Sequence, residues 1–338
     1  MTNSKINMNN FEEVKKSLNS KSLRVCVIGI GRIGLPTALS FAKSGLQTIG
    51  VDINENLVQD INSKKFPLKD EPGYENIFND VLEKKLPNCD AIFHMGACSS
   101  TTETDEKFLT KNNYHYTRHL ATYALEKNIR FIYASSAATY GNGEMGYSDD
   151  EAKLNTLKPL NLYGESKNKF DLWAESQGIL DRVVGLKYFN IFGPNEYHKE
   201  NMQSMVRKGF LQVRDTRKLR LFKSYKPEYA DGDQERDFLY IKDAVSMTLY
   251  FLDRPNLGGI FNVGSGKARN WNDLAKAIFS AMNKKENIEY IDMPSALINQ
   301  YQYHTCSETQ KIHNSGYSDP VMSLEEGIAD YVGQYLIF

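Results

Sequence analysis

The chain has 338 residues and a formal charge of −1, with 41 Lys and Arg against 42 Asp and Glu. At about 150 residues per domain, this length predicts two domains or one enlarged α/β domain. The near-zero charge excludes a protein that binds nucleic acid through bulk positive charge. No run of about 18 apolar residues occurs, which excludes a membrane-spanning helix.

The cysteines and the first residues indicate the compartment. Cys26, Cys89, Cys98 and Cys306 lack metal-ligand spacing, so no metal site is predicted. Residues 1–22 are polar and lack the apolar core of a secretory signal. We therefore expect a cytoplasmic protein with reduced thiols.

Strands and helices are predicted to alternate along the chain. Asn10 and Glu13 have the spacing of a helix N-cap pair, so a short helix is expected at 11–18. The next elements are a strand at 23–28, a helix at 35–44, strands at 47–51 and 91–94, a helix at 114–127, a strand at 130–134, a helix at 163–177 and a strand at 182–188. This alternation predicts an α/β fold, a Rossmann-like doubly wound parallel sheet.

The segment between Asp52 and Ala91 breaks the pattern. It is helical at 54–63 and 73–85 but contains no clear strand. A complete dinucleotide-binding half normally has a third strand there. Either this strand is missing or the connection is unusual.

A glycine-rich turn joins the first strand to the next helix. Gly29, Gly31 and Gly34 have the spacing Gly-x-Gly-x-x-Gly, and Asp52 ends the following strand. Such glycines allow a tight turn, close approach of the backbone to a pyrophosphate, and packing of the helix on the strand. The Asp52 carboxylate would accept hydrogen bonds from the ribose hydroxyls and would repel a 2′-phosphate. The pattern predicts NAD rather than NADP, with a purely structural turn as the alternative.

Tyr163 and Lys167 are four residues apart, on one face of a predicted helix. Upstream, Ser135 and Ser136 end a predicted strand. A phenol with a pKa near 10 is a poor base at neutral pH, and a neighbouring ammonium favours its phenolate form. The three side-chain types together predict removal of a hydroxyl proton beside a nicotinamide, although Tyr-x-x-x-Lys alone is common on amphipathic helices.

Several longer stretches resemble the extended short-chain dehydrogenase/reductase superfamily. Residues 91–338 resemble its ADP-L-glycero-D-manno-heptose 6-epimerase family in particular. The stretches are AIFHMGACSSTTETD (91–105), YASSAATYG (133–141), PLNLYGESK (159–167), KYFNIFGPNEYHK (187–199), RDFLYIKD (236–243) and IFNVGSGKARNW (260–271).

The resemblance implies a catalytic triad of Ser136, Tyr163 and Lys167, with Lys199 as a second acid/base on the other sugar face. Such a 6-epimerase oxidises the sugar at C6 with its bound nicotinamide. The planar carbonyl intermediate then rotates and takes the hydride back on its other face. Two configurations of the alcohol require two proton-transfer groups. Without the resemblance, Lys199 would be interpreted as a solvated loop lysine.

The resemblance also implies the residues that bind the two ligands. Together with the glycine turn, the cofactor site would comprise Gly29, Gly31, Arg32, Ile33, Gly34, Asp52, Met95, Gly96, Ala97, Cys98, Ser99, Asn112, Tyr163, Lys167 and Ile191. The nucleotide-sugar site would comprise Ser136, Asn190, Asn201, Lys208, Phe222, Lys223, Ser224, Tyr225, Arg236 and Tyr301. Arg236 suits pyrophosphate because guanidinium binds its oxygens bidentately. A surface ion pair is the alternative for Arg236. Asn201 and Lys208 depart from the family's usual Ser and His.

The N-terminal segment resembles a different family. VCVIGIGRIGLPTALSFAKSG, IGVDINENLV and the sequence EPG at 71–73 are similar to the NAD-binding start of UDP-glucose/UDP-ManNAc 6-dehydrogenases. The chain is therefore interpreted as a composite joined near 86–90. No segment resembles that family's catalytic cysteine region, so only its NAD half-site is expected here.

These observations predict the domains and the function. Residues 1–22 form an extension, 23–189 with about 236–265 a dinucleotide-binding domain, and 190–235 with 266–338 a smaller C-terminal substrate-binding domain. The expected activity is NAD-dependent epimerisation of ADP-heptose or a related nucleotide sugar by a homo-oligomer without membrane or nucleic-acid partners. The alternatives are a nucleotide-sugar 4-epimerase or 4,6-dehydratase, and a catalytically impaired dinucleotide-binding protein.

Overall fold

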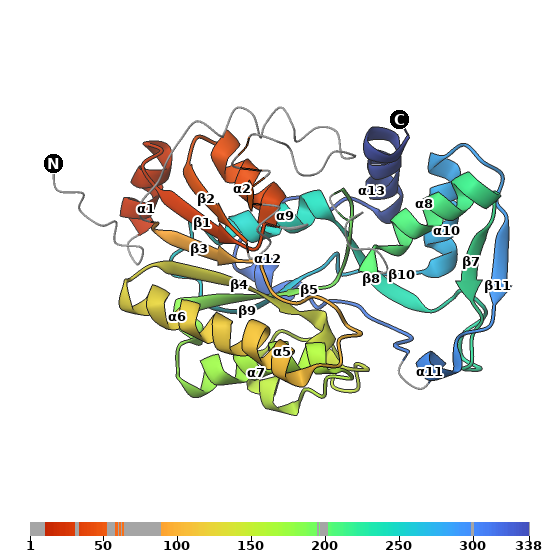
Figure 1. Ribbon diagram of the computed structural model, residues 1–338, viewed down its shortest axis with the longest axis horizontal. Coiled ribbons are helices and arrows are strands. Elements are labelled where there is room, and N and C mark those ends of the chain that lie inside the picture. Colours follow the sequence, from red (N-terminus) through yellow and green to blue (C-terminus); the bar gives the residue numbers. More distant parts are fainter. Residues whose placement is uncertain are drawn as a thin grey trace.

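A six-stranded parallel sheet organises the N-terminal part of the molecule (Figure 1). The computed structural model describes residues 11–30, 34–52, 58–59, 61, 63, 89–194, 196, 202–298 and 301–337. Across the sheet, the strands are β2 (Gln47–Val51), β1 (Arg24–Ile28), β3 (Ala91–His94), β4 (Arg130–Ser136), β5 (Val183–Tyr188) and β9 (Gly259–Val263). Every neighbouring pair is parallel. The prediction of a doubly wound α/β fold is confirmed.

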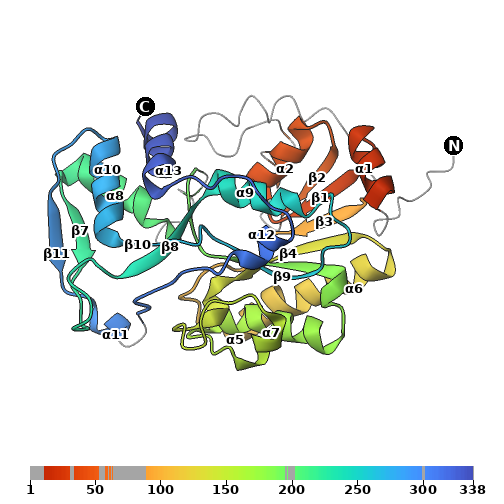
Figure 2. The ribbon, with the colours of Figure 1, turned by 180° about the vertical axis from the view of Figure 1, so that it is seen from behind.

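Helices cover both faces of this sheet (Figures 1 and 2). One face packs against α1 (Phe11–Asn19), α2 (Gly34–Lys43), α9 (Ile241–Tyr250) and α12 (Gln310–Asn314). The other packs against α6 (Tyr116–Glu126) and α7 (Leu162–Ser176). Burial from both sides explains why β3, β5 and β9 are continuously buried.

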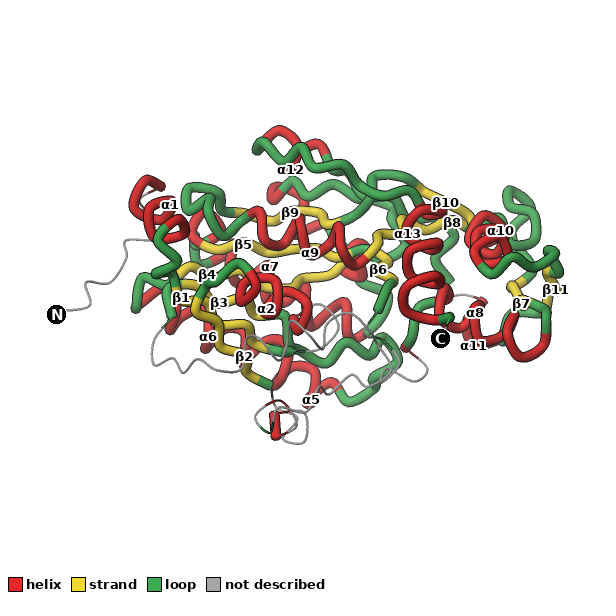
Figure 3. Tube along the Cα trace, turned by 90° about the horizontal axis from the view of Figure 1, so that it is seen from above, coloured by secondary structure: helices red, strands yellow, loops and turns green. Residues whose placement is uncertain are grey.

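The C-terminal part contains two small sheets beside the large one (Figure 3). The first has the order β10 (Ala268–Asn270), β8 (Glu235–Tyr240), β6 (Asn190–Phe192), and the second pairs β11 (Ile288–Ile291) with β7 (Leu219–Phe222). The helices α8 (Met205–Thr216), α10 (Trp271–Ala281) and α13 (Leu324–Tyr331) share a separate apolar core with them. A short helix, α11 (Ser295–Ile298), follows β11.

Two expected features differ from the structure or lie outside it. The helix predicted from Tyr114 begins earlier, as α5 (Glu106–Leu109), and continues through a π-helical stretch at Thr110–His115 into α6. Asp105 starts it by accepting a hydrogen bond from the Phe108 N–H, 2.9 Å away. The helices expected at 54–63 and 73–85 lie largely outside the described residues, as does the question of a third strand there.

Arg130 ties the start of β4 to the loop between α9 and β9. Its side chain is buried, and its guanidinium donates to the carbonyls of Arg254 (3.0 Å), Pro255 (3.3 Å) and Leu257. Burial lowers the pKa of Arg130 to about 10, so the group stays charged at neutral pH. Charged hydrogen bonds to several carbonyls at once hold this loop against the sheet.

We predict that Arg130→Met lowers the free energy of unfolding by about 2–3 kcal/mol, because buried carbonyls lose their donors. Denaturant unfolding of both proteins measures the difference. Arg182→Met is the control, since Arg182 is exposed and its loss should change stability by less than about 0.5 kcal/mol. Equal stability of the Arg130 variant and the native protein would contradict the assignment.

Among the described residues, no helix combines the length and apolar character needed to span a bilayer.

Candidate active site

A cavity of about 720 Å³ lies at the carboxyl ends of the parallel strands. Its wall includes the last residue of β1, β3, β4 and β5, and Asp52 directly after β2. On the opposite side it is lined by residues of the C-terminal part, among them Phe238 and Trp271. Open α/β sheets bind ligands at this edge. The cavity is therefore the candidate site.

Close backbone contacts shape the dinucleotide end of the cavity. Gly29 has φ +84°, and a Cβ there would lie 2.0 Å from the Cα of Gly96. A Cβ on Gly34 would lie 1.8 Å from the Gly29 carbonyl oxygen. Glycine is therefore required at 29 and 34, as the turn pattern predicts. Gly31, Arg32 and Ile33 lie outside the described residues.

Asp52 is bonded to this turn. Its Oδ2 accepts a hydrogen bond from the Ile30 N–H at 2.8 Å, and the residue lines the cavity. Gly29 also donates to the Val51 carbonyl at 2.7 Å. These bonds hold the carboxylate beside the turn, where an adenosine ribose would lie in a dinucleotide bound to this half. The residues present thus fit NAD.

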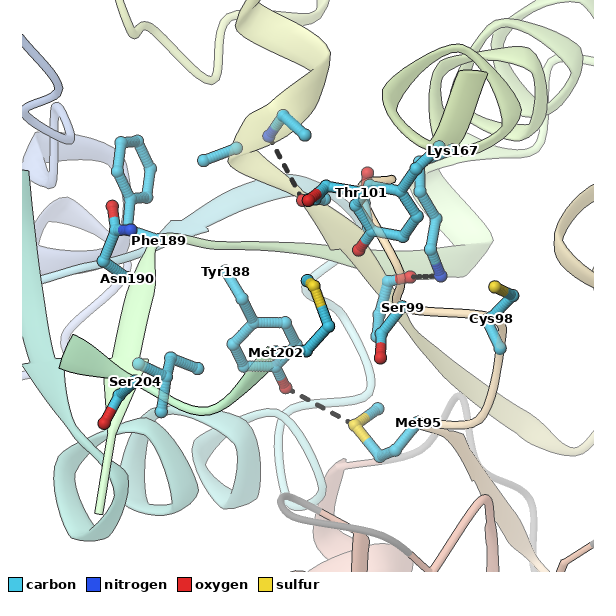
Figure 4. A pocket seen from close by; sticks show the side chains of 18 of the residues that line it. Met95, Cys98, Ser99, Thr101, Lys167, Tyr188, Phe189, Asn190, Met202 and Ser204 are labelled. Atoms are coloured by element: carbon cyan, nitrogen blue, oxygen red, sulfur yellow. Dashed lines mark hydrogen bonds between the residues drawn. The ribbon is translucent and has the colours of Figure 1, made fainter. Parts of the chain in front are cut away.

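The loop after β3 forms the next part of the wall. The cavity is lined here by Met95, Gly96, Ala97, Cys98, Ser99 and Asn112. Figure 4 shows Met95, Cys98 and Ser99 in this wall.

Asn113, which sequence reasoning missed, holds this loop in place. Its side chain accepts from the Cys98 N–H (2.9 Å) and donates to the Cys98 carbonyl (3.0 Å) and to Ser166 Oγ (2.9 Å). An amide is suited to this because it has both donors and an acceptor. Adjacent Asn112 and Asn113 are not distinguishable from sequence pattern alone.

The start of α7 brings Tyr163 against Ser136. Asn161 caps the helix by accepting from the Gly164 N–H at 2.8 Å. Gly164 lies so close to the segment after β4 that a Cβ would be 2.7 Å from the Ala138 carbonyl oxygen. Burial raises the pKa of Tyr163, and its hydrogen bond with Ser136 opposes that shift.

Lys167 lies one turn further along α7, with its ammonium facing the same cavity (Figure 4). Its Nζ donates to the Ala134 carbonyl of β4 at 2.8 Å. Burial lowers the pKa of Lys167 to about 8, and the negative charge of Asp171 opposes this shift. At neutral pH, Lys167 is therefore mostly charged, which favours the phenolate form of Tyr163. The predicted triad is brought together.

His94 and Tyr188 also line the cavity, although the sequence did not single them out. Burial and the nearby Lys167 charge lower the pKa of His94 to about 3, so it is neutral and is not a proton donor at neutral pH. Tyr188 ends β5, and its hydroxyl donates to Met95 Sδ at 3.4 Å (Figure 4). Asn190 and Ile191, both predicted ligand contacts, line the cavity next to it.

Of the predicted nucleotide-sugar residues, Ser136 and Asn190 line the cavity, and the others lie in several separate places. Arg236 is buried between the rings of Tyr301 (5.0 Å) and Trp271 (5.6 Å), and Trp271 reaches the cavity. Phe222 meets the Tyr301 ring edge to face at 6.3 Å, and Lys223, Ser224 and Tyr225 follow in the adjoining loop. Lys208 lies separately on α8. Burial lowers its pKa, and the negative charge of Glu196 opposes that shift. Lys199 and Asn201 lie outside the described residues.

Comparison with known proteins agrees with this geometry. A curated ADP-L-glycero-D-manno-heptose-6-epimerase of Nitratidesulfovibrio vulgaris (strain DP4) is 51% identical over 257 residues, 76% of this chain and 80% of that protein. One from Brachyspira hyodysenteriae is 37% identical over 313 residues, 90% and 94% of the two chains. The crystal structure of the Helicobacter pylori ADP-L-glycero-D-manno-heptose-6-epimerase is 27% identical, with a TM-score of 0.72, over 93% and 96% of the chains.

These relatives confirm the resemblance to heptose 6-epimerases. The model of the NAD dependent epimerase/dehydratase family matches residues 25–264, which include the glycine turn, Ser136, Tyr163 and Lys167. The chain therefore belongs to the NAD dependent epimerase/dehydratase family.

Proposed function

We propose that this protein interconverts the two C6 epimers of ADP-glycero-D-manno-heptose, using a nicotinamide dinucleotide that it holds throughout the reaction. One observation supports this most directly: a single cavity contains the glycine turn, Asp52 and the Ser136–Tyr163–Lys167 group. The 51% identity to a heptose 6-epimerase favours this sugar over the substrates of 4-epimerases and dehydratases.

The protein's own groups handle the proton. A bound nicotinamide supplies the acceptor and donor of hydride at C6. Tyr163 takes the hydroxyl proton of one epimer and returns it when that same epimer is formed again, with Ser136 as hydrogen-bond partner of the same oxygen. The Lys167 ammonium, oriented by the Ala134 carbonyl, stabilises the phenolate. The pKa of Lys167 is about 8, so its ammonium is present at neutral pH and is lost as the pH rises above that value. The stabilisation of the phenolate declines with it.

A second proton-transfer group is needed because the two epimers present the C6 oxygen on opposite faces. Lys199 takes this role in the proposal. It follows β6 and precedes α8, the two elements that flank the cavity at Ile191 and Val206. Arg236 binds the pyrophosphate in the same proposal, since its guanidinium is held between two rings next to the cavity.

We also propose NAD rather than NADP as the dinucleotide, a homo-oligomeric assembly and a cytoplasmic location. The cofactor preference rests on the Asp52 carboxylate, which is held at the glycine turn. Size-exclusion chromatography with light scattering tests the assembly.

Tyr163→Phe should lower kcat by about 10²–10⁴-fold, because a positioned acid/base group is lost. Binding of ADP-glucose, measured by calorimetry, should stay within a few-fold of native. Tyr123→Phe is the control, since Tyr123 is 51% exposed on α6 and should leave kcat unchanged. Near-native turnover by the Tyr163 variant would make Tyr163 a packing residue.

Lys199→Met should abolish interconversion of the epimers while the variant still binds its dinucleotide. Each purified epimer is incubated with the variant, and both are followed by NMR. Lys127→Met, which changes an exposed lysine, should interconvert them at the native rate. Full interconversion by the Lys199 variant would refute the second acid/base and make Lys199 an ordinary loop lysine.

Asp52→Asn should narrow the preference for NAD over NADP by about tenfold, the effect of roughly 1.4 kcal/mol of charge repulsion. The amide oxygen of Asn can still accept from the Ile30 N–H, so the substitution removes mainly the charge. Calorimetric titration of dinucleotide-free protein measures both affinities, with the exposed Asp181→Asn as the control. Tighter binding of NADP than NAD by the native protein would overturn the cofactor assignment.

A further inference from the structure

A fully buried ion pair lies beneath the acid/base site. Asp171 of α7 and Lys187 of β5 are 2.9 Å apart (Oδ2 to Nζ), and both side chains are 0% exposed. The proposed chemistry uses neither residue. Both charges have lost their hydration, so their retention here requires an explanation.

Every described contact of the pair leads to the segment that contains Ser136. Asp171 accepts hydrogen bonds from the Tyr133 hydroxyl (2.9 Å) and from Ser135 Oγ (2.7 Å). Lys187 donates to Thr139 Oγ1 at 2.6 Å and lies 5.0 Å from the centre of the Tyr140 ring. The carboxylate thus has three donors, and the ammonium has two oxygen partners and a ring face.

The pair is connected to two residues of the acid/base site, Lys167 and Ser136. Asp171 follows Lys167 by four residues, on the same side of α7. Thr139 Oγ1, which accepts from Lys187, donates in turn to the Ser136 carbonyl at 2.8 Å. The pair therefore joins α7, which contains Lys167, to β4 and the turn after it.

Packing alone does not account for this arrangement. Apolar side chains of similar size commonly stabilise a core as well as a buried ion pair does. They would not, however, place a negative charge below Lys167. The titratable groups that face Lys167 are Tyr163 and Asp171 on α7, His94 of β3 and Cys98 of the loop after β3.

Among these groups, Asp171 is the carboxylate, and its full burial means that salt in the solvent screens its interaction with Lys167 much less than it would at the surface. His94 is uncharged at neutral pH, because burial lowers its pKa to about 3. Burial and Asp171 also raise the pKa of Tyr133 and Tyr140, so both phenols keep their protons and act as donors or ring partners.

We propose that Asp171, held in place by Lys187, is a positioning residue of the reaction: it fixes α7 against β4 and keeps the Lys167 amine in its ammonium form. This inference rests on the proposed function for its catalytic consequence. The charge state of Lys167, however, can be measured in the absence of turnover.

The decisive variant is Asp171→Asn/Lys187→Met, which removes both charges together and leaves neither ion alone in the core. Protein labelled with ¹³C at the lysine Cε is titrated by NMR, and Lys167→Arg identifies the Lys167 signal. The native midpoint is expected near pH 8. In the double variant, the midpoint should fall by up to about one pH unit, because losing the Asp171 charge lowers the Lys167 pKa and losing the Lys187 charge on β5 offsets this only in part.

Turnover should follow the same shift. In the double variant, the alkaline decline of kcat should move down by the same amount, so that the loss of activity grows from pH 6 to pH 8. Lys187→Arg keeps the pair charged and should keep the native midpoint. If the double variant does not fold, Asp171→Asn/Lys187→Gln, which keeps polar partners for the neighbouring hydroxyls, replaces it.

Asp90→Asn is the matched control. Asp90 is another buried aspartate in an ion pair, with Arg24 at 3.0 Å, at the opposite end of the sheet. Its loss should lower stability and leave the Lys167 midpoint unchanged. An unchanged midpoint in the double variant, or an equal shift in Asp90→Asn, would overturn the proposal. A native protein that fails to epimerise ADP-heptose would refute the proposed function but not the titration result.

Discussion

The contact between the start of α7 and the end of β4 is the constraint on which the site depends. Lys167 donates to the Ala134 carbonyl, and Tyr163 meets Ser136. Gly164 permits the approach, because any larger residue would meet the Ala138 carbonyl oxygen. Parallel strand order then places the loop after β3 and the glycine turn along the same edge. The dinucleotide end and the proton-transfer end of the cavity are thus fixed by one sheet.

The charges of the site follow from the same geometry. Burial lowers the pKa of Lys167, and the carboxylate of Asp171 one turn away opposes this shift. His94, equally close to the cavity, has no such partner charge and is neutral. At neutral pH, Lys167 is therefore mostly charged and His94 is uncharged. Of the two, Lys167 is the group that can stabilise a phenolate.

The fold class could be predicted because buried parallel strands are continuous apolar runs and the glycine turn has a fixed spacing. The pairing of Tyr163 with Lys167 near a strand-end serine could be predicted from side-chain type and spacing, whereas the choice of Ser136 over Ser135 came from the family resemblance. Asn113 and the Asp171–Lys187 pair could not, since their roles depend on contacts between segments distant in sequence. The helix start at Glu106 was missed because a polar first turn has no apolar period. Lys199 and Gly31 lie outside the described residues, and a junction near 86–90 stays a prediction.

The N-terminal segment matters mainly for binding of the cofactor. In the described residues, β1, α2 and β2 form the expected strand–helix–strand unit, and Gly29 and Gly34 make the close contacts that the turn requires. The family model matches from residue 25, so it includes this strand–helix–strand unit.

The most direct test of the central claim is to incubate the freshly purified protein, without added dinucleotide, with each C6 epimer of ADP-glycero-D-manno-heptose. Proton NMR follows both epimers, and denaturation of a parallel sample identifies the dinucleotide released. If the proposed function holds, either epimer yields the same equilibrium mixture and the released dinucleotide is NAD. An unchanged epimer in the presence of retained dinucleotide, or conversion only with stoichiometric consumption of added NAD, would contradict it.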